Sequence, residues 1–419
     1  MSDTAAMTDR TTAPPALLPD SSTDAPREAD HERWTAVADE VAARLATDVV
    51  DRDRVGAAPH AEVELLRSAG LLPLLVPTSS GGHGGSWLTA FDVVSRIARV
   101  DTSIGHVLGY HYLHSWRTRL HRRPDVVERL DAGTAANHWL WGGAGNPRDA
   151  GLELVPTEGG YRVHGKKFFA TGAEVSDRVI ASGTVTTSGQ KYGFALPTHT
   201  DGVVHGGDWD SLGQRMSASG SITFDGAFLA EEDILGPGEQ TDPSAPAYPS
   251  LSAIGFQVLL ALLAVATAEG ALSTGAEYTR TKSRPWATSG VSAADDDPLV
   301  RARYGELASQ VRAARALTDR AGRAWVAAAS RGWELTHEER GEVSVELSAA
   351  KVVTTQAALD ATQGVYELTG ARATKTGQGL DRFWRDVRTL TLHDPVSYKA
   401  VEVGDHLLKG AHPEPSGYS

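Results

Sequence analysis

The sequence contains no cysteine among its 419 residues, so disulfides, thiolate metal ligands and catalytic thiols are all excluded. The absence of cysteine is typical of a reducing compartment, and we expect the protein to be cytoplasmic. Positive charge is also scarce, because the formal net charge is −13 and the longest basic run is His121-Arg122-Arg123. Nucleic-acid backbones require clustered positive charge, so we expect no nucleic-acid partner.

Long hydrophobic runs are scarce as well. One apolar segment, residues 251–268, approaches the length that spans a membrane, but it contains polar residues such as Gln257 and continues in helical register beyond Glu269. This pattern favours a buried bundle helix and no membrane partner. Residues 1–30 are rich in Thr, Ala, Pro, Ser and Asp and lack an apolar core, which predicts a disordered tail and not a signal peptide.

The remaining chain divides into three regions. Residues 31–136 show helical periodicity, for example at Trp34, Val37 and Val41. In residues 137–240, short apolar runs alternate with turn residues, which predicts a compact antiparallel β-domain.

Residues 247–411 contain helical stretches that are long and separated by short breaks, which predicts an up-and-down four-helix bundle. The expected stretches are about 247–283, 298–331, 337–370 and 379–409. The fold class is therefore α+β, with a helical N-terminal domain, a central β-domain and a C-terminal bundle.

Two common site types are not expected. The glycines in the loop 81–85 join helices instead of following a strand, and no acidic residue stands where a ribose partner is needed, so we expect no NAD(P)H site. His111 and His114 are close in sequence, but no HExxH pattern or carboxylate cluster completes a ligand set. We expect them to be partly buried helix residues and expect no metal site.

A titratable pair, His393 and Asp394, precedes Pro395 near the end of the last helical region. A residue before proline is pushed out of the helical conformation, so Asp394 is expected where a helix ends. Such a pair can handle protons at a helix end, and it is also a common way to stop a helix. The pair alone leaves both interpretations open.

The α–β–α order and the loop from Val76 to Gly85 resemble the acyl-CoA dehydrogenase superfamily. Within it, the chain is similar to the flavin-dependent monooxygenase branch typified by the dibenzothiophene-desulfurising monooxygenases. The matching segments lie in all three regions: Gly105–His111, Asp208–Gly213, Ser219–Ser221, Tyr278–Trp286, Gly370–Arg372, Asp381–Asp386 and His393–Lys399.

The resemblance implies the oxygenase component of a two-component monooxygenase. It would use FMNH2, or less favourably FADH2, form a C4a-(hydro)peroxyflavin with O2, and oxygenate a small organic substrate at sulfur, nitrogen or aromatic carbon. A separate NAD(P)H:flavin reductase would supply the reduced flavin. A homotetramer is implied, and the apolar helix 251–268 is a candidate for its buried surface.

The alternative is an acyl-CoA dehydrogenase-like flavoenzyme that oxidises an acyl thioester. In that branch a glutamate removes a proton next to the thioester carbonyl. Asp394 stands at the glutamate position here, and Pro395 replaces the following glycine. A shorter carboxylate lies further from the substrate carbon, and geometry limits a general base before its pKa does, so this alternative is disfavoured.

The resemblance also implies roles for individual catalytic residues. His393 would stabilise or protonate the flavin peroxide, and Asp394 would orient His393. His106 and Tyr110 lie four residues apart and share a helix face, which the resemblance places in the active-site pocket. The alternative is that both simply pack against the β-domain.

For the flavin, Thr171 would bond N5 of the ring and Trp209 would lie beside the ring, unless Trp209 is a structural residue of the β-domain. Ser219 and Arg284 would hold the ribityl-phosphate region. Arg372 is a weaker phosphate candidate, contributed across a subunit interface.

Two departures from the branch indicate a different substrate pocket. Where the relatives carry Asn at the end of a Trp-Trp-x-Gly-Asn run, this chain has Gly143. A second histidine of the branch is replaced by Leu390. We therefore expect a substrate other than dibenzothiophene.

Overall fold

The computed structural model describes residues 28–237 and 245–419. Most of the expected N-terminal tail lies outside the described residues, but Glu28 already begins the first helix. The N-terminal region consists of α1 to α6: Glu28–Ala46, Val49–Val55, His60–Ser68, Trp87–Ala98, Thr102–Arg117 and Pro124–Asn137.

Helix α5 is the central element of this region. It begins where the side chain of Asp101 accepts a hydrogen bond from the backbone N–H of Ile104, a typical N-cap. Almost its entire surface is buried, because it packs on α4, on α7 of the bundle and on β1 of the sheet. Side chains on α5 therefore lie where all three regions of the chain meet.

The middle region is one sheet, in which the strands follow the order β6-β7-β3-β2-β4-β5-β8 and β1 pairs with β4. The strands are Trp141–Ala144, Leu152–Thr157, Gly160–Lys167, Arg178–Val185, Lys191–Pro197, Val203–His205, Ile222–Ala230 and Ile234–Pro237. The expectation of a purely antiparallel domain is wrong, because β1 and β2 both run parallel to β4.

The connection between β3 and β4 explains the parallel pairs. A hairpin at Thr157–Gly160 joins β2 to β3, and β7 occupies the other edge of β3. The next strand, β4, pairs with the other edge of β2. After the reversal at the hairpin and the return through residues 168–177, β4 arrives in the same direction as β2.

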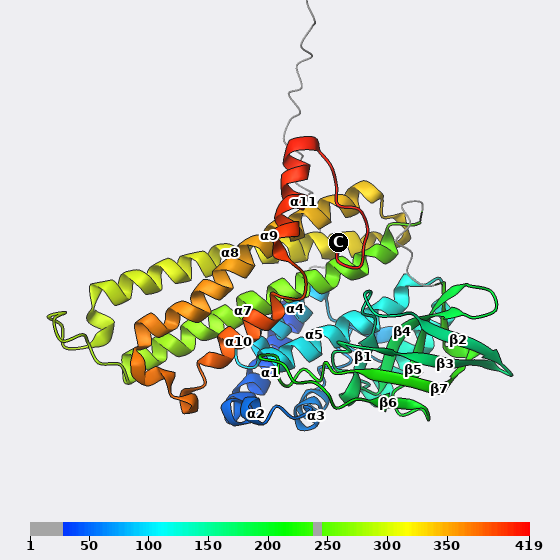
Figure 1. Cartoon of the computed structure of the whole chain (residues 1–419), viewed down its shortest axis with the longest axis horizontal. Helices are drawn as coiled ribbons and strands as arrows, with labels where there is room; N and C mark the ends of the chain where they lie inside the picture. The colour runs from blue at the N-terminus through cyan, green and yellow to red at the C-terminus, as the bar shows by residue number, and fades with distance from the viewer. Residues whose placement is uncertain (1–27, 238–244) are drawn as a thin grey trace, which may run out of the picture.

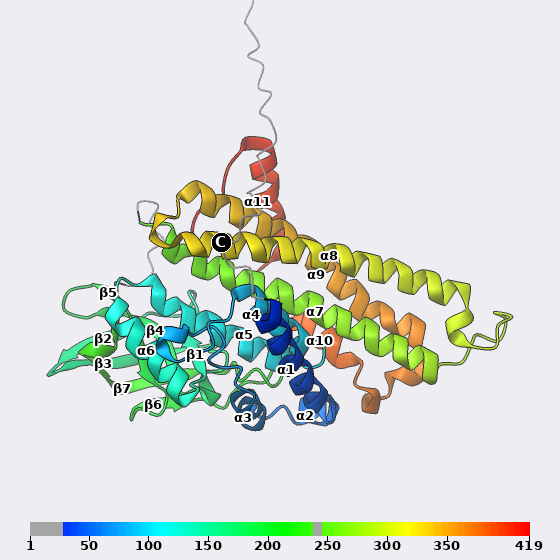
Figure 2. The ribbon, with the colours of Figure 1, turned by 180° about the vertical axis from the view of Figure 1, so that it is seen from behind.

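Three long helices form the body of the bundle: α7 Leu251–Thr281, α8 Pro298–Arg331 and α9 His337–Thr369. The fourth expected stretch is two helices, α10 Asp381–Leu390 and α11 Val396–Lys409, with the turn at Asp394 between them as predicted. α10 packs on α7 and α9, and α11 packs on α9 while its outer end projects from the bundle (Figures 1 and 2).

Helix α7 is long and apolar enough to cross a membrane by length and composition, but 89% of its most apolar window is buried within the chain. It packs against α4, α5, α8, α9 and α10. The expectation of a buried bundle helix is thus confirmed. The expectation that residues 251–268 provide a subunit interface is wrong, because the chain's own helices already cover them.

Candidate active site

A row of aromatic side chains lies along one face of α5. His106, Tyr110 and His114 follow one another at intervals of four residues, so they project from the same side of the helix. The Tyr110 ring lies 4.3 Å from the His106 ring and 5.7 Å from the His114 ring, edge to face in both cases. Phe256 of α7 closes the row, 4.8 Å from Tyr110 and 5.2 Å from His114.

His106 connects this row to the β-domain. Its Nδ1 lies 3.0 Å from Oε1 of Gln214, so Nδ1 carries the proton and donates it to the amide oxygen. Burial, together with the nearby His393, lowers the pKa of His106 to about 4, so the imidazole is neutral at pH 7. Its Nε2 and the amide nitrogen of Gln214 are buried without hydrogen-bond partners among the described residues. The described part of the chain therefore leaves the hydrogen-bonding capacity of both atoms unused.

The His393–Asp394 turn is held by the bundle. Oδ1 of Asp394 accepts hydrogen bonds from Nδ1 of His393 at 3.0 Å and from Nε2 of Gln257 at 3.1 Å. Nζ of Lys351 forms an ion pair with the same carboxylate and also donates to the Gln257 amide oxygen. Asp394, Lys351 and Gln257 are buried, while His393 is 37% exposed.

The carboxylate of Asp394 in this turn is held in its ionised form. Burial alone would raise the pKa of Asp394, but the hydrogen bond from His393 and the charge of Lys351 hold it well below its ordinary value. Burial raises the pKa of Tyr110, and Asp394 raises it further, while His393 lowers the pKa of His106. Such effects act over short distances, so the His393–Asp394 turn lies close to the row of aromatic side chains on α5.

Hydroxyl groups form a chain beside this site. Oγ of Ser219 lies 2.9 Å from Oγ1 of Thr171 and 2.7 Å from Oγ of Ser217. The backbone N–H of Gly172 donates to the carbonyls of Ser217 and Ala218, which ties the two loops together. Two of the residues predicted to bind flavin are therefore neighbours in space, although 48 positions separate them.

Backbone strain is concentrated in the same loops. Among the described residues, four positions other than glycine have a positive φ, and three of them are Phe169, Gln214 and Ala218. Such conformations cost about 1–3 kcal/mol each and are retained mainly where a binding or catalytic site needs them. The strained residues flank the Thr171–Ser219 hydroxyl pair.

Trp209 stabilises the loop that carries Gln214. Its Nε1–H donates to the backbone carbonyl of Gln214 at 2.8 Å, and its ring lies edge to face with the exposed ring of Phe169 at 6.1 Å. The backbone N–H of Gln214 in turn donates to Oδ1 of Asp386 on α10. The loop is thereby fastened to the bundle, which brings Gln214 to His106.

Arg284 and Arg372 lie far from these residues within one chain. Both are exposed and belong to segments near the C-terminal end of α7, which is the end of the bundle away from the sheet (Figure 1). Nη2 of Arg372 donates to the Lys282 carbonyl at 2.6 Å. Neither arginine can reach a ligand beside Thr171 in the same chain.

Three residues of the site were not predicted in these roles. Gln214 and Lys351 carried no recognisable motif, and Gln257 was noted only as a polar interruption of an apolar helix. That interruption was a usable signal, since a lone amide in a core helix requires a partner. His111 and His114 are fully buried, not partly buried as expected.

His111 has a structural role. Its Nε2–H donates to the Leu72 carbonyl at 2.8 Å, and its Nδ1 accepts from the backbone N–H of Trp141 at 3.0 Å. Burial lowers its pKa to about 4. Both ring nitrogens are used, so His111 joins the N-terminal helices to β1 as a neutral imidazole.

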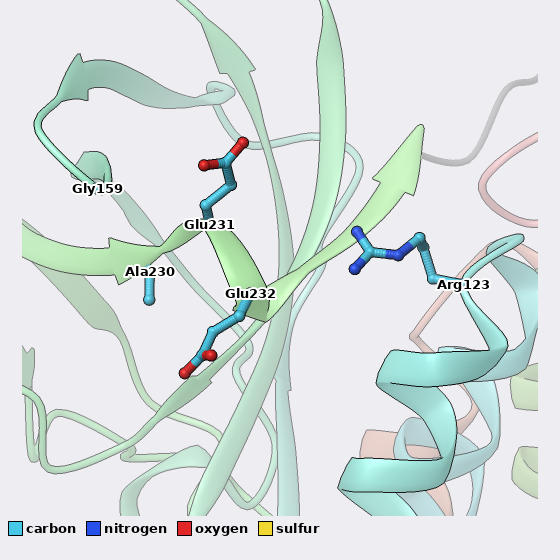
Figure 3. Close-up of a pocket in the computed structure, with 5 residues that line it drawn as sticks. All are labelled: Arg123, Gly159, Ala230, Glu231 and Glu232. Carbon is cyan, nitrogen blue, oxygen red and sulfur yellow. The ribbon is translucent and has the colours of Figure 1, made fainter.

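Two other features of the surface do not resemble an active site. A hollow of about 540 Å³ lies at the β7–β8 corner, and in Figure 3 the side chains of Glu231 and Glu232, which line it, point apart and away from Arg123. The side chains of Glu342, His406 and His412 approach one another near the outer end of α11. The two imidazoles are stacked with planes only 17° apart, so their in-plane lone pairs do not converge on one ion.

Comparisons with known proteins agree with this architecture. The model of the acyl-CoA dehydrogenase N-terminal domain matches residues 28–117, and that of the acyl-CoA dehydrogenase C-terminal domain matches residues 258–398. The chain therefore belongs to the acyl-CoA dehydrogenase family.

The relatives that are 37–39% identical to this chain include monooxygenases. The chain is 39% identical to a probable FMNH2-dependent monooxygenase, SfnC of Pseudomonas putida, over 92% of this chain and 97% of the relative. It is also 39% identical to the dibenzothiophene monooxygenase of Mycolicibacterium goodii, over 90% and 94% of the two chains. The FMN-bound crystal structure of TdsC from Paenibacillus sp. A11-2 superposes with a TM-score of 0.88 at 37% identity, over 92% of this chain and all of TdsC.

Proposed function

We propose that this protein is the oxygenase component of a two-component, FMNH2-dependent monooxygenase that oxygenates a small organic substrate. The observation that carries the proposal is the His393–Asp394–Lys351 cluster, which faces the neutral row on α5. The bound reduced flavin supplies two electrons and activates O2. One oxygen atom enters the substrate and the other leaves as water.

The same cluster disfavours the dehydrogenase alternative. A carbon base must accept a proton, yet the carboxylate of Asp394 is paired with Lys351 and has a pKa well below its ordinary value. Such a carboxylate is a weak base, and it is 7% exposed. The position that removes a proton in a dehydrogenase is therefore used here to hold an imidazole.

In the proposed mechanism, His393 holds or moves the proton. Its Nδ1 is engaged by Asp394, so Nε2 is the nitrogen left to exchange a proton with the reacting oxygen. The carboxylate of Asp394 holds the ring of His393 in this orientation. The buried His106 and the partly buried Tyr110 would exclude water from the opposite side of the site.

The chain has groups that fit a flavin. The hydroxyl chain of Thr171, Ser219 and Ser217 offers donors to the ring and ribityl oxygens, and the unpartnered nitrogens of His106 and Gln214 lie nearby. Arg284 and Arg372 would bind the phosphate from a second copy of the chain, because they are too remote within one copy. A flavin site shared between subunits therefore requires an oligomer, which we propose is a homotetramer.

Exposed apolar side chains support such an assembly. They gather on α11 and near the loop at the far end of the bundle. They are Tyr398, Val401, Leu407 and Leu408 on α11, and Trp286 and Leu299 at the other end. Exposed apolar patches of this kind mark subunit contacts.

The reduced flavin would come from a separate NAD(P)H:flavin reductase in the cytoplasm. The substrates we propose to screen are uncharged sulfur and nitrogen heteroaromatics, since relatives include a dibenzothiophene monooxygenase and TdsC, which has been crystallised with FMN and indole. The test is conversion with FMN, a purified flavin reductase and NADH under air. FMN-dependent oxygenation of at least one member of the panel supports the proposal, and conversion of none of them contradicts it.

A further inference from the structure

His114 stands against β1 at a position where the sheet has no side chain. A Cβ atom built on Gly143 would lie 2.1 Å from Cε1 and 2.5 Å from Nε2 of His114. Real atoms do not approach so closely, so the imidazole occupies the space that a side chain at 143 would need. A histidine of α5 thus fills the space beside β1 that Gly143 leaves open.

The polar atoms of His114 are not fully used within the chain. The side chain is 5% exposed, and its Nδ1 has no hydrogen-bond partner in the described part of the structure. Burial, reinforced by Arg117, His111 and His106, lowers the pKa of His114 well below its ordinary value. The ring is therefore a neutral imidazole with one N–H and one lone pair. Leaving such a buried polar atom unpaired is unfavourable, and a bound ligand with a matching hydrogen bond would relieve that cost.

The surroundings of His114 define the shape of that ligand. Tyr110 and Phe256 place their rings 5.7 Å and 5.2 Å from it, so the wall next to the imidazole is aromatic, and the guanidinium of Arg117 lies 5.8 Å from the Phe256 ring centroid. Flat aromatic compounds pack well against edge-to-face rings. A heteroatom at the edge of such a compound would meet the nitrogen of His114.

We propose that His114 is a substrate-positioning residue that binds the ring N–H of an uncharged heteroaromatic substrate, in place of the amide that Gly143 lacks. This inference rests on the proposed function and narrows its substrate class to N–H heteroaromatics such as indoles. His114 acts on binding, and proton handling stays with His393.

The first test uses two substrates of nearly the same shape. Indole carries an N–H, whereas benzothiophene has sulfur in that place. His114→Leu keeps the volume but removes the hydrogen bond, so it raises KM for indole about tenfold, leaves kcat within about twofold and leaves KM for benzothiophene unchanged. His114→Gln, which retains an acceptor, recovers part of the indole affinity. Equal losses for both substrates, or no loss for indole, would overturn the proposal.

The second test concerns the His114–Gly143 pair and is independent of catalysis. Gly143→Asn alone clashes with the imidazole and lowers the melting temperature, and His114→Ala alone leaves a cavity. The double variant His114→Ala/Gly143→Asn is more stable than the sum of the single effects predicts, and its new amide restores indole binding measured by calorimetry. Additive melting temperatures, or indole binding equal to that of His114→Ala, would overturn the proposal.

The two proposals fail in different ways. If the wild-type protein oxygenates no member of the panel, the proposed function is wrong, while calorimetry of indole and benzothiophene with the FMN-loaded protein still tests His114. If the wild-type protein oxygenates indole but His114→Leu binds it as tightly as before, only the role of His114 is lost.

Discussion

The two walls of the candidate site are built on opposite principles. On the bundle side, Asp394 is charged and its partners His393, Gln257 and Lys351 hold it in one orientation. On the α5 side, His106 and His114 are neutral and buried, and each keeps a nitrogen without a partner in the described structure.

This difference indicates a separate role for each side of the site. A fully hydrogen-bonded charged cluster is rigid and suits a group that must hold a proton in one place. Buried polar atoms without partners suit the binding of a ligand, because the ligand removes their desolvation cost. The bundle wall would therefore serve the chemistry, and the α5 wall would serve recognition.

The largest effect is expected when the negative charge of Asp394 is removed from the bundle side of the site. Asp394→Asn leaves the Lys351 ammonium buried without a counter-charge, which costs about 3–5 kcal/mol of unfolding free energy and abolishes oxygenation. Urea unfolding followed by circular dichroism measures the first effect. The double variant Asp394→Asn/Lys351→Met removes both charges and regains at least half of the lost stability. Wild-type stability of Asp394→Asn would contradict the account.

His393→Ala separates chemistry from folding on the same wall. The side chain is 37% exposed, so its loss changes the unfolding free energy little, whereas removing a positioned proton carrier lowers kcat about 100-fold or more. FMN affinity, measured by fluorescence quenching, stays near the wild-type value. The neighbouring variant Leu392→Ala, which truncates an exposed side chain, serves as the control. Product formation near the wild-type rate would remove His393 from the mechanism.

The contact between α10 and the loop that carries Gln214 can be disrupted at Gly213. A Cβ at this position would lie 2.1 Å from the backbone oxygen of Arg385, which cannot move aside easily. Gly213→Ala therefore displaces the loop that carries Gln214 and weakens FMN binding about tenfold. Gly151→Ala is the matched control, because a Cβ there meets no atom within 4 Å. Equal FMN affinity in the two variants would show that the loop does not position the flavin.

The neutrality of the α5 wall predicts a pH effect on stability. The unfolded chain protonates His106 and His111 near pH 6.5, whereas burial lowers the pKa of both to about 4 in the folded protein. The unfolded state thus binds more protons between these values, and stability falls as the pH is lowered. Each histidine contributes a loss of about 2 kcal/mol between pH 7.5 and 5, measured by urea unfolding.

Asp386 opposes this effect and sharpens the test. Burial raises its pKa to about 7, so the folded state takes up a proton there before the unfolded state does, and stability from this group is gained as the pH falls from about 7 to 4. Asp386→Asn removes that gain, so its stability falls more steeply between pH 7.5 and 5 than that of the wild type. A shallower slope would contradict the assignment.

The smallest expected effect concerns the remote arginines. Arg284→Gln weakens FMN binding about three- to tenfold, with no change in the unfolding free energy of the protomer, because the exposed guanidinium would act on a flavin bound by a second copy. Arg388→Gln on α10 is a control for the loss of one positive charge. Equal FMN affinity of the two variants would argue against a shared site.

Local patterns in the sequence were enough to predict much of this arrangement. Helical spacing placed His106 and Tyr110 on one face, and the proline rule placed Asp394 at a helix end. The parallel pairing of β2 with β4 was not predictable, because it depends on β7 occupying the edge of β3.

The contacts missed from the sequence are all long-range. Lys351 meets Asp394 across 43 positions, and Gln214 meets His106 across 108. The loss of an amide at Gly143 was visible in the sequence, but its replacement by His114 was not, since 29 residues and a change of domain separate the two. Such pairs become visible only when the packing of α5 on β1 is known.

The most direct test of the central claim is the fate of oxygen. The purified protein is mixed with FMNH2, ¹⁸O2 and indole, and the product is analysed by mass spectrometry. The account predicts a product that carries one ¹⁸O atom, and about 100-fold less of this labelled product from His393→Ala in the same time. A product without ¹⁸O, together with reduction of a protein-bound flavin by butyryl-CoA, would contradict the account.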